Sequence, residues 1–158
     1  EIKQSLRANA LKIKIDLNIK LWIVGRKIPD KIKNLTQDLD VIFDENAPED
    51  TSLIYKKSFL LLSPIRMGGG TSFKILEAMS CGVPVITTKL GAEGITNGDE
   101  VIRADKVEDI SNSVRKLITD KSYYEKIARS ARKLIEEKYD WKQIIKKLEE
   151  VYDKAVEK

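Results

Sequence analysis

The sequence predicts an α/β fold: a Rossmann-like parallel sheet with flanking helices and extra C-terminal helices. Short apolar runs of strand length alternate with helix-like segments over the first two thirds of the chain. These runs are continuously apolar, which is typical of strands buried on both faces of a parallel sheet. The last third shows helical periodicity alone. With 158 residues, the chain has the length of one domain, which we place at residues 1–158.

Each element of the first part follows from an apolar run and its flanking residues. Leu21–Val24 is an apolar run of strand length. A helix is predicted after Pro29, where Ile32 and Leu35 lie on one face. Val41–Phe43 predicts the next strand.

The middle of the chain repeats this alternation. In order, we predict a short helix over about 50–57, a strand over 59–62, a helix over 71–80, a strand over 85–87 and a weaker strand over 101–102. Gly82 and Pro84 mark the end of the helix at 71–80, because glycine adopts the left-handed conformation that closes a helix and proline cannot continue one.

Three amphipathic helices are predicted at the C-terminal end. Their apolar residues recur at spacings of three and four, and breaks at 120–122 and 139–140 separate them. We interpret all three apolar stripes as core-facing. The stripes are Val107, Ile110, Val114, Leu117 and Ile118; Tyr124, Ile127, Ala128, Ala131, Leu134 and Ile135; and Trp141, Ile144, Ile145, Leu148, Val151, Tyr152 and Ala155.

Composition argues against several function classes. Lys and Arg total 29 against 25 Asp and Glu, and the basic residues are mixed with acids along helices, which argues against a nucleic-acid-binding surface. The chain has no histidine, so the commonest general base and the commonest metal ligand are absent. No apolar run approaches the roughly 20 residues that span a bilayer.

Cys81 is the single cysteine, so no disulfide can form within the chain. This favours a reducing compartment and a cytoplasmic location. The residue lies between Ser80 and Gly82 at a predicted helix end, and we interpret it as a buried filler and not as a reactive thiol.

The segment most informative about chemistry is 63–85, where a buried strand leads into a glycine-rich loop that opens a helix. The three glycines at 68–70 allow the backbone to approach a ligand closely and to adopt positive φ angles. A helix N-terminus presents unpaired N–H groups and a partial positive charge, which suits a phosphate. Thr71 or Ser72 can cap this helix or donate to a phosphate oxygen.

Glu77 adds a carboxylate to this segment. Seven helical residues make about two turns, or roughly 10 Å, so we expect Gly70 and Glu77 on nearly the same face, a nucleotide's length apart. A diphosphate at the helix start would then place a ribose near the Glu77 carboxylate, which can accept hydrogen bonds from two ribose hydroxyls. In the alternative interpretation, Glu77 is a surface acid and the glycines only form a loop, because the segment is neither a Walker motif nor a Gly-x-Gly-x-x-Gly motif.

The same segment resembles the C-terminal, donor-binding domain of glycosyltransferase family 4 (glycosyl transferases group 1), whose members are retaining, metal-independent enzymes with the GT-B fold. The resemblance rests on Pro64-x-Arg66-x-Gly68-Gly69-Gly70-Thr71-x-x-Lys74-Ile75-Leu76-Glu77-Ala78-Met79-x-x-Gly82-Val83-Pro84-Val85, followed by Thr87 and Gly91-Ala92-Glu93-Gly94. It extends to Leu21-x-Ile23-Val24-Gly25, Glu49-Asp50, Tyr55, Tyr139 and Trp141, and so covers nearly the whole chain. It implies a nucleoside-diphosphate sugar as donor substrate, without a metal or other cofactor.

The resemblance also implies roles for single residues. Glu77 matches the glutamate that holds the ribose. The backbone of Gly69, Gly70 and Thr71 matches the loop that meets the diphosphate and the sugar. Asp44 follows the predicted strand at 41–43, in the region where the family contacts the base.

Further candidates lie around the glycine-rich loop. Ser72 follows Thr71 at the expected helix start. Arg66 either offsets diphosphate charge or forms a structural ion pair, and Lys74 either binds the diphosphate or faces solvent. Glu93 lies in a loop after the next strand, at the carboxyl edge where α/β sheets bind ligands.

The chain departs from the family pattern in two places. Many members carry two glutamates eight positions apart, and Gly69 replaces the first one here, a feature shared by a subgroup with a Gly-Gly-Gly-Thr loop. The family domain also opens with a central strand and a loop with basic diphosphate ligands, whereas Glu1–Lys20 is typical of a helix tail and a turn. We therefore expect the first strand to be missing, which leaves a vacant sheet position with unpaired strand edges.

From these observations we expect the donor-binding domain of a retaining glycosyltransferase of the hexosyltransferase type, which acts in polysaccharide or glycolipid synthesis. The chain begins with Glu1, so we expect a fragment that lacks the N-terminal acceptor-binding domain and is inactive alone. Peripheral membrane association of the full protein is compatible with this setting.

Three alternatives compete with this expectation. A non-catalytic nucleotide-binding or scaffold domain is favoured by the missing glutamate at Gly69 and the missing upstream basic residues. A GT-B epimerase or phosphorylase conflicts with the segment from the glycines to Glu77. A response-regulator-like domain would need an acidic cluster, for which Asp44 and Glu45 are a poor match.

Overall fold

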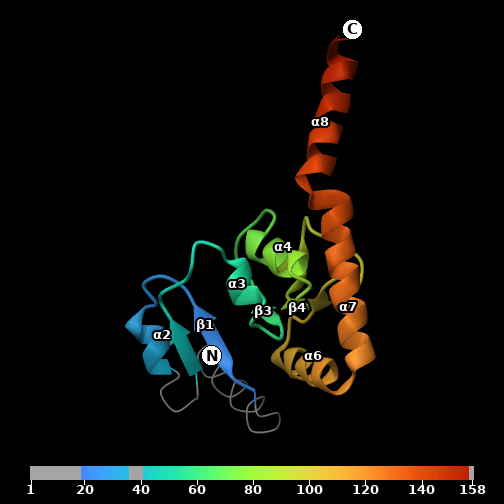
Figure 1. Ribbon diagram of the computed structural model, residues 1–158. Helices are drawn as coiled ribbons and strands as arrows, with labels where there is room; N and C mark the ends of the chain where they lie inside the picture. The colour runs from blue at the N-terminus through green and yellow to red at the C-terminus, as the bar shows by residue number, and fades with distance from the viewer. Residues whose placement is uncertain (1–18, 36–40, 157–158) are drawn as a thin grey trace.

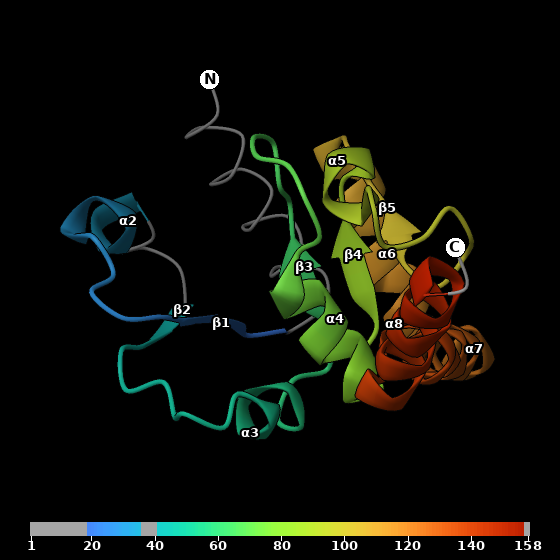
Figure 2. The same ribbon diagram turned by 90° about the horizontal axis from the view of Figure 1, so that it is seen from above.

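The computed structural model describes residues 19–35 and 41–156. Within these ranges, parallel strands with flanking helices form the α/β architecture that the sequence predicts (Figure 1). The strands form two separate sheets, β1–β2 and β3–β4–β5, which Figure 2 shows from above. The prediction of a missing first strand concerns Glu1–Lys20, most of which lies outside the described residues.

The smaller sheet pairs β1 (Leu21–Val24) with β2 (Val41–Asp44), in the register Leu21 to Val41. Both predicted strands are confirmed, and β2 is one residue longer than predicted. Helix α2 (Asp30–Leu35) lies between β1 and β2 in the chain. The expected burial on both faces is wrong for this sheet, because the Ile42 side chain is 44% exposed and belongs to neither core cluster of the described residues.

The larger sheet has β4 (Val85–Thr87) at its centre, between β3 (Leu61–Ser63) and β5 (Ile102–Arg103). The prediction of a strand over 59–62 is wrong at its start: the Phe59 side chain is 48% exposed and its ring stacks on that of Tyr124, with the ring centroids 4.7 Å apart. Strand β5 is shifted by one residue from the predicted 101–102.

Helices cover both faces of β4, because successive side chains of a strand point to opposite faces. Val85 packs into a cluster with Met79 of α4 (Phe73–Ser80) and Leu134 of α7 (Lys121–Leu134). On the other face, Ile86 packs against Val114 and Leu117 of α6 (Val107–Thr119). This arrangement holds β4 and the start of α4 in fixed positions.

The elements around α4 refine the prediction. Helix α3 (Ser52–Tyr55) is shorter than the predicted 50–57, and the one-turn helix α5 (Lys89–Ala92) was not predicted. The predicted end of α4 is confirmed: Gly82 has φ +69°, and the Val83 N–H donates to the Ala78 carbonyl at 3.0 Å. Cys81 is half-buried against the core, and its thiol is free.

Three C-terminal helices form as predicted, but α7 (Lys121–Leu134) already begins inside the predicted break at 120–122. Asp120 separates α6 from α7 and caps α7, since its Oδ1 accepts a hydrogen bond from Tyr123 N at 2.9 Å. After α7 the chain forms a π-helical turn, η1 (Ile135–Tyr139), and then α8 (Trp141–Val156). No helix in the described ranges is long and apolar enough to cross a membrane.

The prediction that the third apolar stripe faces the core is wrong. Helix α8 projects away from the sheets (Figure 1) and buries none of its residues. Trp141 is 75% exposed and Leu148 is 51% exposed. Periodicity showed that the helix has an apolar face, but it contains no information about whether another element covers that face.

Candidate functional site

The loop between β3 and α4, residues 64–72, is called the glycine loop below, and it borders a cavity of about 480 Å³. This volume lies in the usual range for small-molecule sites. The cavity is at the carboxyl end of β3, where parallel α/β sheets bind ligands. It is lined by Leu62, Ser63, Pro64, Ile65, Met67, Gly68, Gly69, Gly70, Thr71, Ser72, Lys74, Leu90 and Gly91.

The glycine loop contains three consecutive glycines at 68–70, and the backbone requires glycine at two of these positions. Gly68 has φ +120° and Gly70 has φ +84°, conformations that residues with a β-carbon rarely adopt. Gly69 is different, because its φ is not in this region and a β-carbon there would meet no atom within 4 Å. The fold would therefore accept a residue with a side chain at position 69.

The start of α4, which borders the cavity, has unpaired backbone donors. Ser72 is the N-cap with extended backbone, but its side chain makes no capping hydrogen bond. The Ile75 and Leu76 N–H groups bond to the Ser72 carbonyl. Within the described residues, the N–H groups of Phe73 and Lys74 bond to no acceptor. These groups and the helix dipole favour an anion at this position.

The prediction of a helix over 71–80 is wrong at its first two residues, because α4 begins at Phe73. The positive φ of Gly70 and the extended backbone of Ser72 are incompatible with helix. Gly70 and Glu77 are therefore not two helical turns apart on one face. Glu77 lies four residues into α4, or roughly 6 Å along the axis from its start.

Hydrogen bonds fix the glycine loop against α5. The Thr88 hydroxyl donates to the Ile65 carbonyl at 2.5 Å, and its oxygen accepts from Gly91 N at 3.0 Å. Gly91 also packs tightly on Thr87, whose Oγ1 a β-carbon at position 91 would meet. Thr88 thus joins the glycine loop to α5. The absence of a side chain at Gly91 allows α5 to pack closely on Thr87.

Glu77 is held by a residue of α3. The hydroxyl of Tyr55 donates a hydrogen bond to Glu77 Oε2 at 3.0 Å, while Tyr55 itself is only 9% exposed. Burial and the Glu77 carboxylate raise the pKa of Tyr55 far above its ordinary value, so the hydroxyl remains a donor. Glu77 is half-buried and does not line the cavity itself.

Lys74 and Arg66 occupy different places. Both are exposed, and neither forms an ion pair within the described ranges. Lys74 is the only charged residue among the described residues that line the cavity, whereas Arg66 does not line it. The cavity is therefore electropositive, because a lysine and the start of a helix face it and no lining residue is acidic.

Ser63 has a place in the site that sequence analysis did not assign to it. It lines the cavity at the end of β3, is 3% exposed, and its hydroxyl makes no hydrogen bond to another described residue. A buried hydroxyl without a partner is unfavourable unless something else bonds to it. The signal in the sequence is a serine that directly follows the apolar run 59–62.

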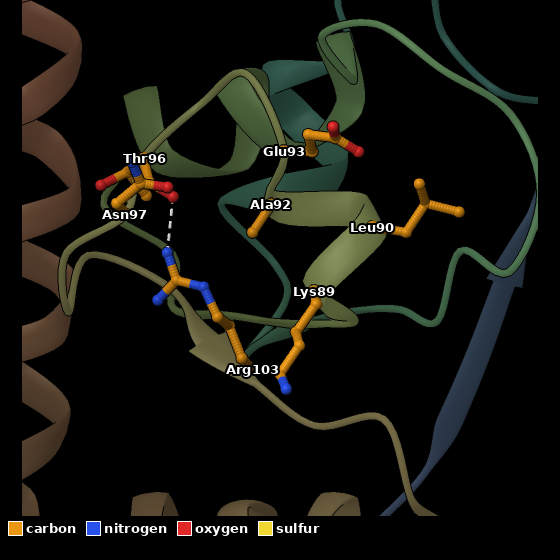
Figure 3. Close-up of a pocket in the computed structure, with 7 residues that line it drawn as sticks. All are labelled: Lys89, Leu90, Ala92, Glu93, Thr96, Asn97 and Arg103. Atoms are coloured by element: carbon orange, nitrogen blue, oxygen red, sulfur yellow. Dashed lines mark hydrogen bonds between the residues drawn. The ribbon is translucent and has the colours of Figure 1, made fainter.

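Glu93 lines a second cavity of about 540 Å³ beside α5 (Figure 3). Leu90 lines both cavities. In this second cavity, Arg103 donates to the carbonyls of Thr96 at 2.5 Å and Gly98 at 2.6 Å. Its lining residues are Lys89, Leu90, Ala92, Glu93, Thr96, Asn97 and Arg103.

Asp44 lies apart from the glycine loop. It ends β2 in the smaller sheet, and its Oδ1 accepts a hydrogen bond from Asn46 N at 3.0 Å. It lines neither cavity. Among the residues that the structure describes, no cluster of three or more metal-ligating side chains forms.

The sequence that forms this site matches a family of known proteins. The glycosyl transferases group 1 family matches residues 3–120, which is most of the chain. The chain belongs to the glycosyl transferases group 1 family. The match includes the glycine loop and α4, and it confirms the resemblance that those residues carry. No curated protein matches the chain in sequence.

Solved structures share the fold of this member of the group 1 family. The C-terminal domain of the group 1 protein LpcC from Francisella tularensis aligns with a TM-score of 0.72 and 22% identity, over 87% of this chain and 79% of that chain. HepE from Anabaena, in complex with UDP and glucose, has a TM-score of 0.75 and 18% identity, over 93% of this chain and 44% of that chain. WaaG, a glycosyltransferase involved in lipopolysaccharide biosynthesis, has a TM-score of 0.65 and 25% identity, over 82% and 37%.

The predicted fold is therefore that of the C-terminal domain of a GT-B glycosyltransferase. This chain covers less than half of HepE and of WaaG. The similarity at these identities concerns the fold, and the chemistry of the site has to be argued from its own residues.

Proposed function

We propose that this chain is the donor-binding domain of a retaining glycosyltransferase, and that it binds the diphosphate of a nucleoside-diphosphate sugar at the glycine loop. The observation that carries this proposal is the pair of unbonded N–H groups at the start of α4, beside Lys74. Backbone donors at a helix start and one unpaired cation are what a diphosphate needs. The complex of HepE with UDP and glucose is consistent with it.

The remaining candidates are assigned to parts of the donor as follows. Gly69, Gly70, Thr71 and Ser72 offer backbone and hydroxyl donors along the cavity, and the buried Ser63 hydroxyl offers another. Glu77 binds the ribose with the oxygen that Tyr55 leaves free. Arg66 approaches the diphosphate from the exposed side of the glycine loop. Asp44 is assigned to the base of the nucleotide, and Glu93 is assigned to the transferred sugar.

The proposed reaction breaks the bond between the anomeric carbon and the diphosphate oxygen, which leaves with the electron pair. An acceptor hydroxyl forms the new bond to this carbon with retained configuration, and its proton passes to the departing phosphate. The α4 start and Lys74 stabilise the charge on the leaving group, a task that a metal performs in other enzymes. An N-terminal acceptor-binding domain supplies the acceptor, in the cytoplasm, and this chain alone is inactive.

A second candidate is a non-catalytic nucleotide-binding domain, which the missing carboxylate at Gly69 favours. It predicts the same diphosphate binding but no transfer when an acceptor domain is supplied. Detection of sugar transfer by the complete protein rules it out.

The test of the proposal is calorimetric titration with UDP, GDP and ADP. We expect one base to be preferred, and Glu77→Ala to weaken its binding by about 1.5–3 kcal/mol, the range for a hydrogen bond to a charged group. Lys74→Ala should weaken all three equally, because it contacts the shared diphosphate. Glu149→Ala, which removes an exposed acid from α8, is the matched control and should bind as the wild type does.

The proposal is wrong if a folded wild-type chain binds none of the three nucleotides. It is also wrong in its assignment of Glu77 if Glu77→Ala and Glu149→Ala bind with equal affinity. Circular dichroism of each variant establishes that it is folded before the titration.

A further inference from the structure

Tyr139, at the C-terminal end of η1, reaches from the C-terminal helices to the turn at Gly94 and Ile95. Its hydroxyl lies 2.9 Å from the Gly94 carbonyl oxygen and 3.0 Å from that of Ile95, and it donates to this pair. Burial raises the pKa of Tyr139, which keeps the hydroxyl protonated. The ring packs against the core cluster that contains Ile95 and Met79.

Gly94 in turn lies against the glycine loop. Its φ is +75°, and a β-carbon at this position would be 3.4 Å from Thr71 Oγ1. Thr71 lines the cavity, and so do Leu90 and Gly91, which precede Gly94 in the same segment. The carbonyls that Tyr139 binds therefore belong to a turn in contact with the candidate diphosphate site.

The π-helical turn places Tyr139 at this position. Asp140 N donates to the Ile135 carbonyl at 2.9 Å, so the turn contains one residue more than an α-helical turn. The turn packs against α4, the helix whose start borders the cavity. It is followed at once by α8, whose first turn bonds to the Asp140 carbonyl.

We infer that Tyr139 is a positioning residue for the donor site, because it holds the Gly94–Ile95 turn against Thr71 and so fixes the glycine loop before the ligand binds. This inference rests on the proposed function for its ligand. Preorganised donors bind an anion more tightly than mobile ones, because no ordering of the loop opposes binding.

Tyr124 provides a matched control for Tyr139. Its hydroxyl also donates to a backbone carbonyl, that of Phe59, at 3.0 Å, and burial also raises its pKa. Phe59 precedes β3, whereas the glycine loop follows β3, so this contact lies at the opposite end of the strand. Tyr139→Phe and Tyr124→Phe remove the same kind of bond from the two ends.

The test measures nucleotide affinity, urea unfolding and backbone amide NMR signals for both variants. Both should lose a similar part of the free energy of unfolding. Only Tyr139→Phe should weaken the preferred nucleotide, by roughly threefold or more, and only it should shift the Gly70 and Thr71 amide signals of the free protein. Equal affinities of the two variants, or unshifted signals in Tyr139→Phe, overturn the inference.

The two proposals fail separately in this experiment. If the wild type binds no nucleotide, the proposed function fails, and the amide signals of the free protein still decide whether Tyr139 positions the glycine loop. If the wild type binds and Tyr139→Phe binds equally well, the proposed function stands and the role of Tyr139 is refuted.

Discussion

The Tyr55 hydroxyl donates a hydrogen bond to Glu77 Oε2 at 3.0 Å and so joins α3 to α4. One oxygen of the carboxylate is thereby fixed, and Oε1 makes no hydrogen bond to another described residue. A carboxylate held in this way has a defined rotamer before any ligand arrives. The contact gives Tyr55 a measurable part in a site that it does not line.

Tyr55→Phe removes this contact and leaves the ring in the core. We expect the free energy of unfolding to fall by about 0.5–1.5 kcal/mol, the net value of one hydrogen bond. Nucleotide affinity should fall by roughly threefold to tenfold, because the Glu77 carboxylate becomes mobile. Urea unfolding and calorimetry measure the two effects. An unchanged affinity in a folded variant would show that Tyr55 does not orient Glu77.

The same tyrosine predicts a change of stability at alkaline pH. Burial and the Glu77 carboxylate raise its pKa in the folded state, so the unfolded state releases this proton first. The contribution of Tyr55 to stability is complete below the unfolded pKa of roughly 10 and is lost as the pH rises above it. Between about pH 8 and about pH 10.5, the wild type should lose more unfolding free energy than Tyr55→Phe does. Equal losses contradict the prediction.

The glycine loop predicts opposite effects at adjacent positions. Gly70→Ala places a β-carbon at φ +84° and should destabilise the fold by about 1 kcal/mol. Gly69→Ala meets open space at an ordinary φ and should be neutral or stabilising by about 0.4–1 kcal/mol, because it restricts the unfolded chain. Urea unfolding of the two variants separates them. A destabilising Gly69→Ala would indicate that the loop differs from this conformation.

Sequence patterns predicted the elements whose signals are local. Continuous apolar runs located β1 and β4, and the Gly82 signal located the end of α4. Sequence signals failed at the start of α4, where the loop conformation sets the first helical residue. The start of α4 was predicted two residues early because the positive φ of Gly70 cannot be read from the residue type alone.

Contacts between distant segments were beyond the reach of the sequence. Tyr55 and Tyr139 were noted only as parts of a resemblance, and their partners Glu77 and Gly94 lie 22 and 45 positions away in the chain. Whether the Ser63 hydroxyl finds a hydrogen-bond partner depends on the elements that pack around it, and these are distant in the sequence. The residues of the glycine loop were predictable because the loop is one continuous segment.

The sequence also does not reveal whether an apolar helix face is covered, as α8 illustrates. The structure predicts different costs for truncating a leucine of α7 and a leucine of α8. Leu134 of α7 is 7% exposed within the core cluster, whereas Leu148 of α8 is 51% exposed. Leu134→Ala should destabilise the chain by about 2–5 kcal/mol, the cost of a cavity in a packed core. Leu148→Ala should cost less than about 1 kcal/mol, because half of its side chain already contacts water and alanine is favourable in a helix.

Urea unfolding of the two leucine variants at several protein concentrations measures this contrast. A small cost at Leu148 that does not depend on concentration means that the apolar face of α8 is bare in the isolated chain, as the structure has it. A cost at Leu148 near that at Leu134 contradicts the exposed helix, because only a covered leucine loses that much free energy when it is truncated. If that cost also grows with protein concentration, the cover is a second copy of the chain, since association makes stability depend on concentration.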